Sequence, residues 1–275
     1  MDLTELIKEA FVFPSNNFKQ LAIYIVFSFI ATLFTFGGVF SLVGIAFSGA
    51  FAIVSVIFVI IAILVAFILT GYQIALIKSG IEHDELAPEF DYKENIIIGV
   101  KAVIVKIVYF IIPAIITIIV ALLTGLTQNF VEAFQSAATN ATNTAMASNV
   151  TYASSIPANV SAALYGSITV TALVAIIVFI IFELIAMMGH ARLANTESLG
   201  EALNISEAFK DMGRIGYGNV IATVVIVCLV TVIINLILTG LNMVIPFISI
   251  LSVIITPYLI FFAYRAIGSL YSEIA

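Results

Sequence analysis

The sequence predicts an all-α, polytopic membrane protein with six transmembrane helices and further helices at the cytoplasmic membrane surface. Three observations lead to this prediction. Of the 275 residues, 63% are hydrophobic and only 9% are charged, whereas a soluble domain is about a quarter charged. The apolar residues gather in six runs that are long enough to cross a bilayer. The basic residues lie on one side of these runs.

The six runs are expected to be helices rather than strands. A span needs roughly 20 apolar residues to cross a hydrocarbon core about 30 Å thick. Lipid offers the backbone no hydrogen-bond partners, and none of the runs alternates as barrel strands do. We therefore expect one integral membrane domain over residues 1–275. Its predicted spans are 21–43, 50–77, 96–124, 168–188, 220–238 and 244–268.

The ten Lys and Arg residues set the predicted orientation. They precede the first span, lie between spans two and three and between spans four and five, or end the sixth span. Lys101 and Lys106 lie just inside the third run. The segments 44–49, 125–167 and 239–243 contain no basic residue. The positive-inside rule therefore places both termini in the cytoplasm, and we expect the protein in the plasma membrane.

Three segments on the predicted cytoplasmic side are candidates for helices that lie on the membrane surface. The first precedes Pro14 and has one apolar face. The second, residues 91–106, is equally well explained as the inner start of the third span. The third, residues 198–212, begins with Ser198 and Glu201 at the spacing of a capping box.

The long outer segment, 125–167, is dominated by Ala, Thr, Asn and Ser. Within it, residues 128–137 are compatible with an amphipathic helix that extends the third span. Residues 139–161 are expected to form a polar, weakly structured loop. Asn140, Asn149 and Asn159 each begin an N-glycosylation acceptor triplet. A segment so rich in Asn and Thr also produces such triplets by chance.

Glu183 interrupts the fourth span, where a charge costs about 2.5–3.5 kcal/mol on insertion scales. His190 follows seven residues later on the same helix face, and Lys106 lies in the inner half of the third span. Three interpretations stay open. Glu183 forms a structural ion pair with Lys106, or it forms a proton or cation site with His190. Alternatively, it is a neutral or interfacial carboxyl without a special role.

Other polar groups favour structural roles. Asn235 shares one face of the fifth span with Thr231 and Thr239, and such groups usually join membrane helices by hydrogen bonds rather than line a permeation path. The acidic loop at 83–91 offers oxygen ligands. It lacks a recognised calcium-loop spacing, so a solvated acidic loop is the favoured interpretation.

The sequence contains no catalytic, nucleotide-binding or zinc-binding signature. The chain has one cysteine, two histidines and a net charge of −6, which disfavours nucleic acid as a partner. We therefore expect a non-enzymatic protein with no catalytic residue, resident metal or cofactor.

Several short motifs stand out along the chain. They are Glu9-Ala10-Phe11-Val12-Phe13-Pro14, Gly71-Tyr72, Asp84-Glu85-Leu86, Pro88-Glu89-Phe90-Asp91, Ser198-Leu199-Gly200, Arg214-Ile215-Gly216-Tyr217-Gly218 and Pro257-Tyr258-Leu259. Together they resemble those of a largely archaeal family of multi-pass membrane proteins, defined as a domain of unknown function. This chain departs from the usual pattern by carrying Ala87 inside the Leu-Pro-Glu-Phe string. The resemblance implies six spans and motif loops on the cytoplasmic side, and it brings no activity or ligand with it.

These observations favour a membrane scaffold or a partner subunit of an envelope complex. The alternative is a transporter of a small solute or an ion. The expected partners are the lipid bilayer and other membrane proteins or further copies of the chain.

Overall fold

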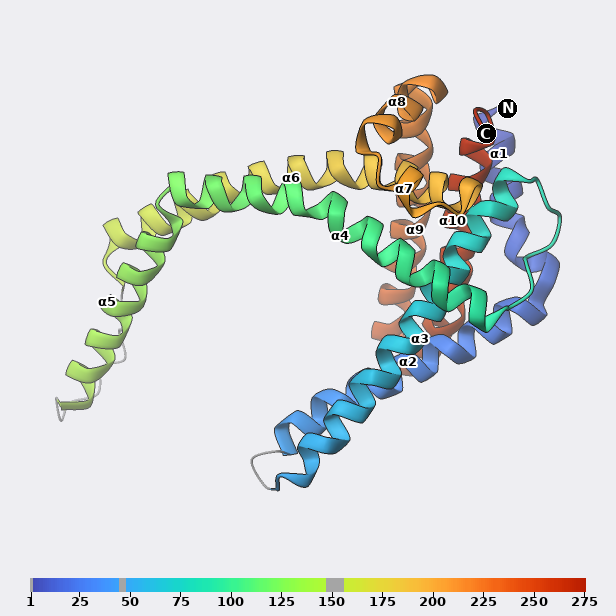
Figure 1. Ribbon diagram of the computed structural model, residues 1–275. Coiled ribbons are helices and arrows are strands. Elements are labelled where there is room, and N and C mark those ends of the chain that lie inside the picture. The colour runs from blue at the N-terminus through green and yellow to red at the C-terminus, as the bar shows by residue number, and fades with distance from the viewer. Residues whose placement is uncertain (1, 45–47, 147–155) are drawn as a thin grey trace. The chain divides into compact units, whose positions relative to one another are not determined.

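The computed structural model describes residues 2–44, 48–146 and 156–275 (Figure 1). Within these ranges all regular structure is helical, which confirms the predicted all-α class. The first elements are α1 (Leu3–Val12), the 3-10 turn η1 (Phe13–Asn17), α2 (Phe18–Gly44), α3 (Ala50–Ile81), α4 (Tyr92–Leu123) and α5 (Leu126–Met146). They are followed by α6 (Ala158–Thr196), α7 (Leu199–Ala202), α8 (Ile205–Ile215), α9 (Tyr217–Val244), the 3-10 turn η2 (Pro246–Ile248) and α10 (Ser249–Tyr271).

Six helices are long and apolar enough to cross a membrane, namely α2, α3, α4, α6, α9 and α10. The predicted number of spans is therefore confirmed. The boundary between the last two spans differs from the prediction, because α9 continues to Val244 and α10 begins only at Ser249. Pro246 explains the break, since proline has no backbone N–H to continue a helical hydrogen-bond ladder.

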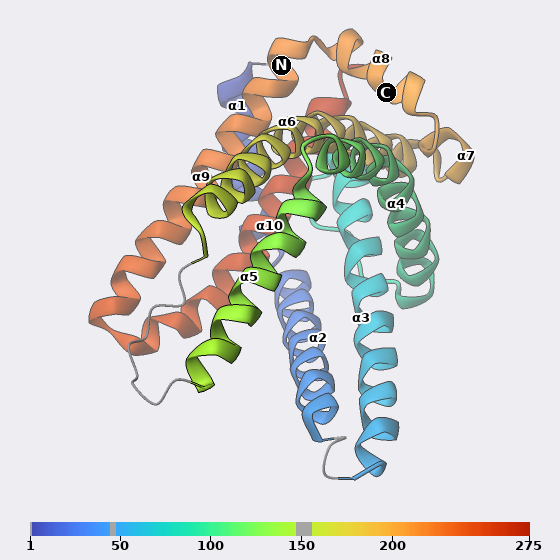
Figure 2. The ribbon, with the colours of Figure 1, turned by 90° about the vertical axis from the view of Figure 1, so that its left-hand side faces the viewer.

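The chain divides into two compact units. The first contains Met1–Ile107 and Ile185–Ala275, and the second contains Val108–Leu184. Helices α4 and α6 each pass from one unit into the other. In the first unit, α2 and α3 lie side by side, and α10 packs against α3 (Figure 2). Both termini lie at the end of this unit that carries α1 and α8 (Figures 1 and 2). We call it the inner end, because the sequence predicts that both termini are cytoplasmic.

An aromatic core closes the inner end of the first unit. Tyr24 from α2, Tyr72 from α3 and Phe261 from α10 are fully buried and pack together. Phe90, from the loop that follows α3, stacks on Tyr72 with ring centroids 3.8 Å apart. Aromatic pairs of this kind add about 0.5–1.5 kcal/mol beyond the area they bury.

Hydrogen bonds fix the loop between α3 and α4 to this core. Tyr72 donates its hydroxyl to the carbonyl of Pro88 at 2.9 Å. Asn16 and Asn17 of η1 donate their side-chain amides to the carbonyls of Glu85 and Ala87. The Gly71-Tyr72 and Pro88–Asp91 motifs, which are separate in sequence, therefore lie next to each other.

Two glycines allow α3 to approach α4 closely. A Cβ atom placed on Gly71 would lie 1.8 Å from the carbonyl oxygen of Asn95 on α4. A Cβ on Gly99 of α4 would lie 1.9 Å from the carbonyl oxygen of Phe67. Because Cβ atoms essentially never come this close to backbone, only glycine permits the crossing at these two positions.

The second unit contains residues 108–123 of α4, helix α5 and residues 158–184 of α6. The Thr124 and Thr171 hydroxyls are hydrogen-bonded at 3.0 Å, and Asn129 of α5 donates to the Ser167 hydroxyl of α6 at 3.2 Å. The predicted helix over 128–137 is present and continues to Met146. The prediction of a weakly structured loop is wrong for residues 139–146 and 158–161, which are helical. Backbone hydrogen bonding and the many alanines sustain these turns, and Thr139 bonds back to the Gln135 carbonyl.

Candidate functional site

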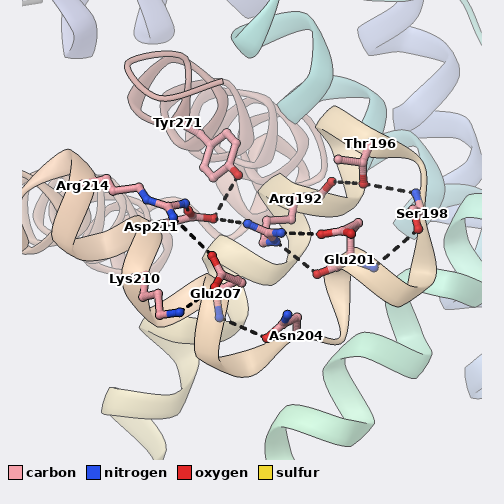
Figure 3. Close-up of polar contacts among 10 residues, drawn as sticks. All are labelled: Arg192, Thr196, Ser198, Glu201, Asn204, Glu207, Lys210, Asp211, Arg214 and Tyr271. Atoms are coloured by element: carbon pink, nitrogen blue, oxygen red, sulfur yellow. Dashed lines mark hydrogen bonds and ion pairs between the residues drawn. The ribbon is translucent and has the colours of Figure 1, made fainter.

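Helix α8 positions the most densely connected polar cluster of the first unit (Figure 3). Asn204 begins the helix by accepting the Glu207 backbone N–H on its side-chain oxygen at 3.2 Å. Gly216 ends it with a φ of 98°, a conformation that favours glycine. Ala208, Met212 and Ile215 form the buried face of the helix. One turn of this buried face also contains a carboxylate.

That carboxylate belongs to Asp211, whose side chain is 1% exposed. It accepts Nη1 of Arg192 on α6 at 2.8 Å, Nη1 of Arg214 on α8 at 2.6 Å and the hydroxyl of Tyr271 on α10 at 3.1 Å. A buried carboxylate is tolerated when it is paired and hydrogen-bonded in this way. Asp211 therefore joins α8 to α6 and to α10, through residues 19 and 60 positions away.

Arg192 extends the cluster to α7. Its Nη2 pairs with the Glu201 carboxylate at 2.6 Å, and its Nε donates to the Glu201 carbonyl at 3.1 Å. The capping box predicted at Ser198 is half present. Ser198 accepts the Glu201 N–H on its hydroxyl, whereas the Glu201 carboxylate bonds to Arg192.

Charges at the rim of the cluster face solvent. Glu207 pairs with Lys210 at 2.7 Å and with Arg214 at 3.3 Å. The hydrogen bond from Lys210 lowers the pKa of the Glu207 carboxyl. Exposed pairs of this kind contribute little to stability.

A second buried cation fixes α1 to α10. The Arg265 side chain is 1% exposed, donates to the Glu9 carboxylate at 2.6 Å and to the Ser79 carbonyl, and lies over the Phe13 ring. Nearby, Tyr258 donates its hydroxyl to the carbonyl of Phe11 at 2.6 Å. The N-terminal motif and the Pro257-Tyr258-Leu259 motif therefore contact each other at the inner end.

An acidic pocket of about 230 Å³ lies between α3, the loop that follows it, α4 and the end of α6. Lys78 also lines the pocket, and it pairs with Glu197 at 2.5 Å. This hydrogen bond lowers the pKa of the Glu197 carboxyl. Asp91 accepts the backbone N–H groups of residues 93 and 94 and thereby begins α4. The acidic residues that line the pocket are Glu82, Asp84, Glu89, Asp91, Glu94 and Glu197.

A larger crevice of about 610 Å³ lies between α2, α3 and α10. Its lining contains no charged residue, and its polar groups are mainly hydroxyls of Ser and Thr. Gln73 donates its amide to the Tyr24 hydroxyl at 2.7 Å, and both residues line the crevice.

Residues 54–243 match the family model described as Protein of unknown function (DUF4013). The match covers more than half of the 275 residues. The chain belongs to the DUF4013 family. Comparisons with curated proteins and with solved structures give no match. The predicted resemblance to a family of unknown function is therefore confirmed.

The DUF4013 match includes the motifs at Gly71-Tyr72, 84–91, 198–200 and 214–218. These line the acidic pocket or belong to the cluster around Asp211. The N-terminal motif and Pro257-Tyr258-Leu259 lie outside the matched residues and pack against each other.

The structure places the three charged candidates of the membrane region as follows. His190 is half-buried in the first unit and donates Nε2–H to the Ala102 carbonyl at 3.2 Å, which joins α6 to α4. Lys106 is an exposed residue of the first unit, and Glu183 is an exposed residue of the second. A Glu183–Lys106 pair, and a proton or cation site with His190, both stay predictions.

The remaining candidates also stay predictions. Asn235 is exposed on α9 and donates to the Thr231 carbonyl of its own helix at 2.8 Å. Asn140 belongs to α5, and Asn159 is exposed in the first turn of α6. Asn149 lies outside the described residues.

Sequence reasoning missed Asp211, Tyr271 and the interior position of Arg265. Only Asp211 has a partial signal in the sequence, since Asp211 and Arg214 have the i,i+3 spacing of an ion pair on a helix. Nothing local distinguishes this Asp from its exposed neighbours on α8. Its burial follows from the packing of α6 and α10, which only the fold provides.

Proposed function

We propose that this DUF4013 chain is a non-enzymatic subunit of a membrane complex, a scaffold whose spans are completed by other protein chains. The low burial of its spans is the observation that carries the proposal. In the most apolar 18-residue windows of α2 and α9, both of which lie wholly in the first unit, 11% of residues are buried. The corresponding shares for α3 and α10 are 22% and 33%.

Apolar exposure alone is compatible with lipid, so the polar groups decide between lipid and protein as the covering partner. Asn235 and Thr239 are exposed on α9 with Thr231 on the same face. Amide and hydroxyl groups within membranes commonly hydrogen-bond across helices. Asn235 and Thr239 each donate one hydrogen bond to a carbonyl of α9 itself. A second helix against this face would bond to the Asn235 amide oxygen and its second N–H, whereas acyl chains would not.

The cluster around Asp211 supports a structural role rather than catalysis. Three donors use the carboxylate, and its 1% exposure leaves no approach for a substrate. Buried and fully hydrogen-bonded networks of this kind hold elements in a fixed arrangement. They suit a rigid inner end from which the spans extend.

Photo-crosslinking in native membranes tests the scaffold. Benzoylphenylalanine at Val232, three residues before Asn235 and on the same face, is expected to give a discrete protein adduct. Ile237 is the matched control, because it is similarly exposed (55% against 46%) and lies on the opposite side of α9. Asn235→Leu should reduce the adduct at Val232. Lipid adducts alone at both positions would contradict the proposal.

The crevice between α2, α3 and α10 favours a second candidate, transport of a small neutral solute. Pro257 has no N–H to donate to the Val253 carbonyl, and both residues line the crevice. Backbone carbonyls that a helix leaves free in this way help to build midplane sites in transporters. Proteoliposomes should then take up glycerol faster than protein-free vesicles, and Gln73→Leu should abolish the difference. Equal uptake by both kinds of vesicle would eliminate this candidate.

A further inference from the structure

Only two of the six acidic side chains that line the acidic pocket have a structural role in the fold. Asp91 begins α4, and Glu197 is neutralised by Lys78. The side chains of the other four acids form no ion pair within the described part of the chain. Four carboxylates around a small concavity produce a strong negative potential, which attracts a cation. These four residues are Glu82, Asp84, Glu89 and Glu94.

Asn95 supplies a second and independent feature. It lines the same pocket, its residue is 4% exposed, and its Nδ2 is buried with no hydrogen-bond partner among the residues that the structure describes. An unsatisfied buried donor is costly, and it is satisfied when a ligand brings an acceptor. A ligand that carries both a cation for the carboxylates and a neutral oxygen for Asn95 would match both features of the pocket.

The size of the pocket and the arrangement of its side chains limit the class of ligand that it can bind. In the described residues, no three His, Cys, Asp or Glu side chains are arranged to hold a metal ion. The pocket volume of about 230 Å³ is below the roughly 300–1,000 Å³ of typical small-molecule sites. A phosphate or a free carboxylate would be repelled by the acidic lining. What fits is a segment about one residue long that has a positive charge next to an oxygen acceptor.

We propose that this pocket binds the amino terminus of a partner polypeptide. The α-ammonium would bond to the carboxylates of Glu89 and Glu94, and the first peptide carbonyl would accept Nδ2 of Asn95. The two groups are adjacent on every polypeptide that begins with an unmodified amine. The proposal rests on the scaffold function, and it names the chemistry by which a partner is recognised.

Three probes separate the two required groups, with binding measured by calorimetry on the full chain in nanodiscs. Ala-Ala-Ala amide carries both the ammonium and the carbonyl. Its N-acetyl derivative lacks the charge, and n-butylamine lacks the acceptor. We expect the free tripeptide amide to bind at least about tenfold more tightly than either of the other two. The N-acetyl derivative cannot form the charge-assisted hydrogen bonds to the carboxylates, and n-butylamine cannot accept the buried hydrogen bond from Asn95.

Variants then assign the two groups. Glu89→Gln with Glu94→Gln should weaken tripeptide binding by about tenfold or more. Its matched control is Glu85→Gln with Glu5→Gln, which also removes one loop acid and one acid from the first turn of a helix and is expected to bind normally. Asn95→Ala should make the tripeptide bind no better than n-butylamine. The protein should lose little stability, because Nδ2 makes no bond to lose and removing a buried unsatisfied donor offsets part of the lost packing.

Several outcomes would overturn the assignment. Equal binding of the N-acetyl derivative would exclude a role for the ammonium. If the control pair weakens tripeptide binding equally, the effect comes from the net charge of the protein and not from the pocket. Ethanolamine binding as tightly as the tripeptide would identify a free amino alcohol or a lipid headgroup as the ligand.

Failure here and failure of the scaffold proposal are distinguishable. A Val232 adduct without tripeptide binding would overturn the pocket assignment only. Tripeptide binding without any adduct would overturn the scaffold only.

Discussion

Asp211→Asn is the most direct test of how the inner end is held together. The substitution keeps the shape of the side chain and removes its charge. Arg192, whose side chain is 12% exposed, would lose one of its two carboxylate partners in a buried position. Tyr271 would retain an oxygen to which it can donate. The substitution therefore isolates the charge of a buried ion pair from its packing.

The expected loss can be calculated from the contacts. Removing one partner of a buried pair costs about 3–5 kcal/mol, and a neutral hydrogen bond kept by Asn returns about 1 kcal/mol. The contact with Arg214 adds little, because that side chain is 54% exposed. We expect a net loss of about 3 kcal/mol. For a protein of this size the melting temperature should fall by about 6–12 °C.

The melting temperature can be followed by the helical circular dichroism signal in detergent, since the chain has no tryptophan to report by fluorescence. Arg214→Met is the control, and it should cost less than about 1 kcal/mol. Two results would refute this reasoning: Asp211→Asn has the melting temperature of the wild type, or Arg214→Met lowers the melting temperature as much as Asp211→Asn does. In either case the buried pair does not hold these helices together.

Three further predictions address packing, pH and orientation. Gly71→Ala places a methyl group against the α4 backbone and should cost about 3 kcal/mol; unchanged melting would contradict the close crossing. Lys78 lowers the pKa of Glu197 below its ordinary 4.5. The stability from this pair is therefore present above that pH and lost as the pH falls through the lowered pKa. Glu197→Gln should lack this acid-dependent loss, and an identical pH profile would contradict the pairing. In a chain without its native cysteine, a cysteine at Thr139 should react with an impermeant reagent on intact cells. One at Lys210 should not, and the reverse result would invert the topology.

The spans could be predicted because their signal is local. Length and hydropathy over about 20 residues are enough to recognise α2 or α9, whatever they pack against. The predicted fifth span stops at 238 because Thr239, Gly240 and Asn242 are typical turn residues, yet α9 continues through them to Val244. The predicted sixth span begins too early, at 244, because Ile245 and Pro246 lie in an apolar stretch. In that context one missing N–H breaks the helix without any change in hydropathy.

The pocket could not be predicted because its parts become special only in three dimensions. Asn95 is an ordinary polar residue in the first turn of a helix. It is buried because Gly71, 24 positions earlier, lets α3 approach its backbone. The acids of the loop resemble a solvated charge cluster in sequence, and Tyr72 and Asn16 hold that loop in place over the pocket. Arg265 and Glu9 are separated by 256 positions, so no local pattern connects them.

The inner end thus contains two kinds of buried polar group. One kind is hydrogen-bonded within the fold and stabilises it, and the other has an unused donor that is available to a ligand. Asp211 already bonds to three donors of the fold, so its substitution should lower stability and leave tripeptide binding unchanged in the protein that remains folded. Asn95 has an unused donor, so its substitution should lower tripeptide binding and cost little stability. A buried polar group that the fold does not satisfy is costly to maintain. Its persistence is explained when a ligand supplies the missing partner. Opposite effects of the two variants in the two assays would establish this division, whereas parallel effects would show that both residues serve the fold alone.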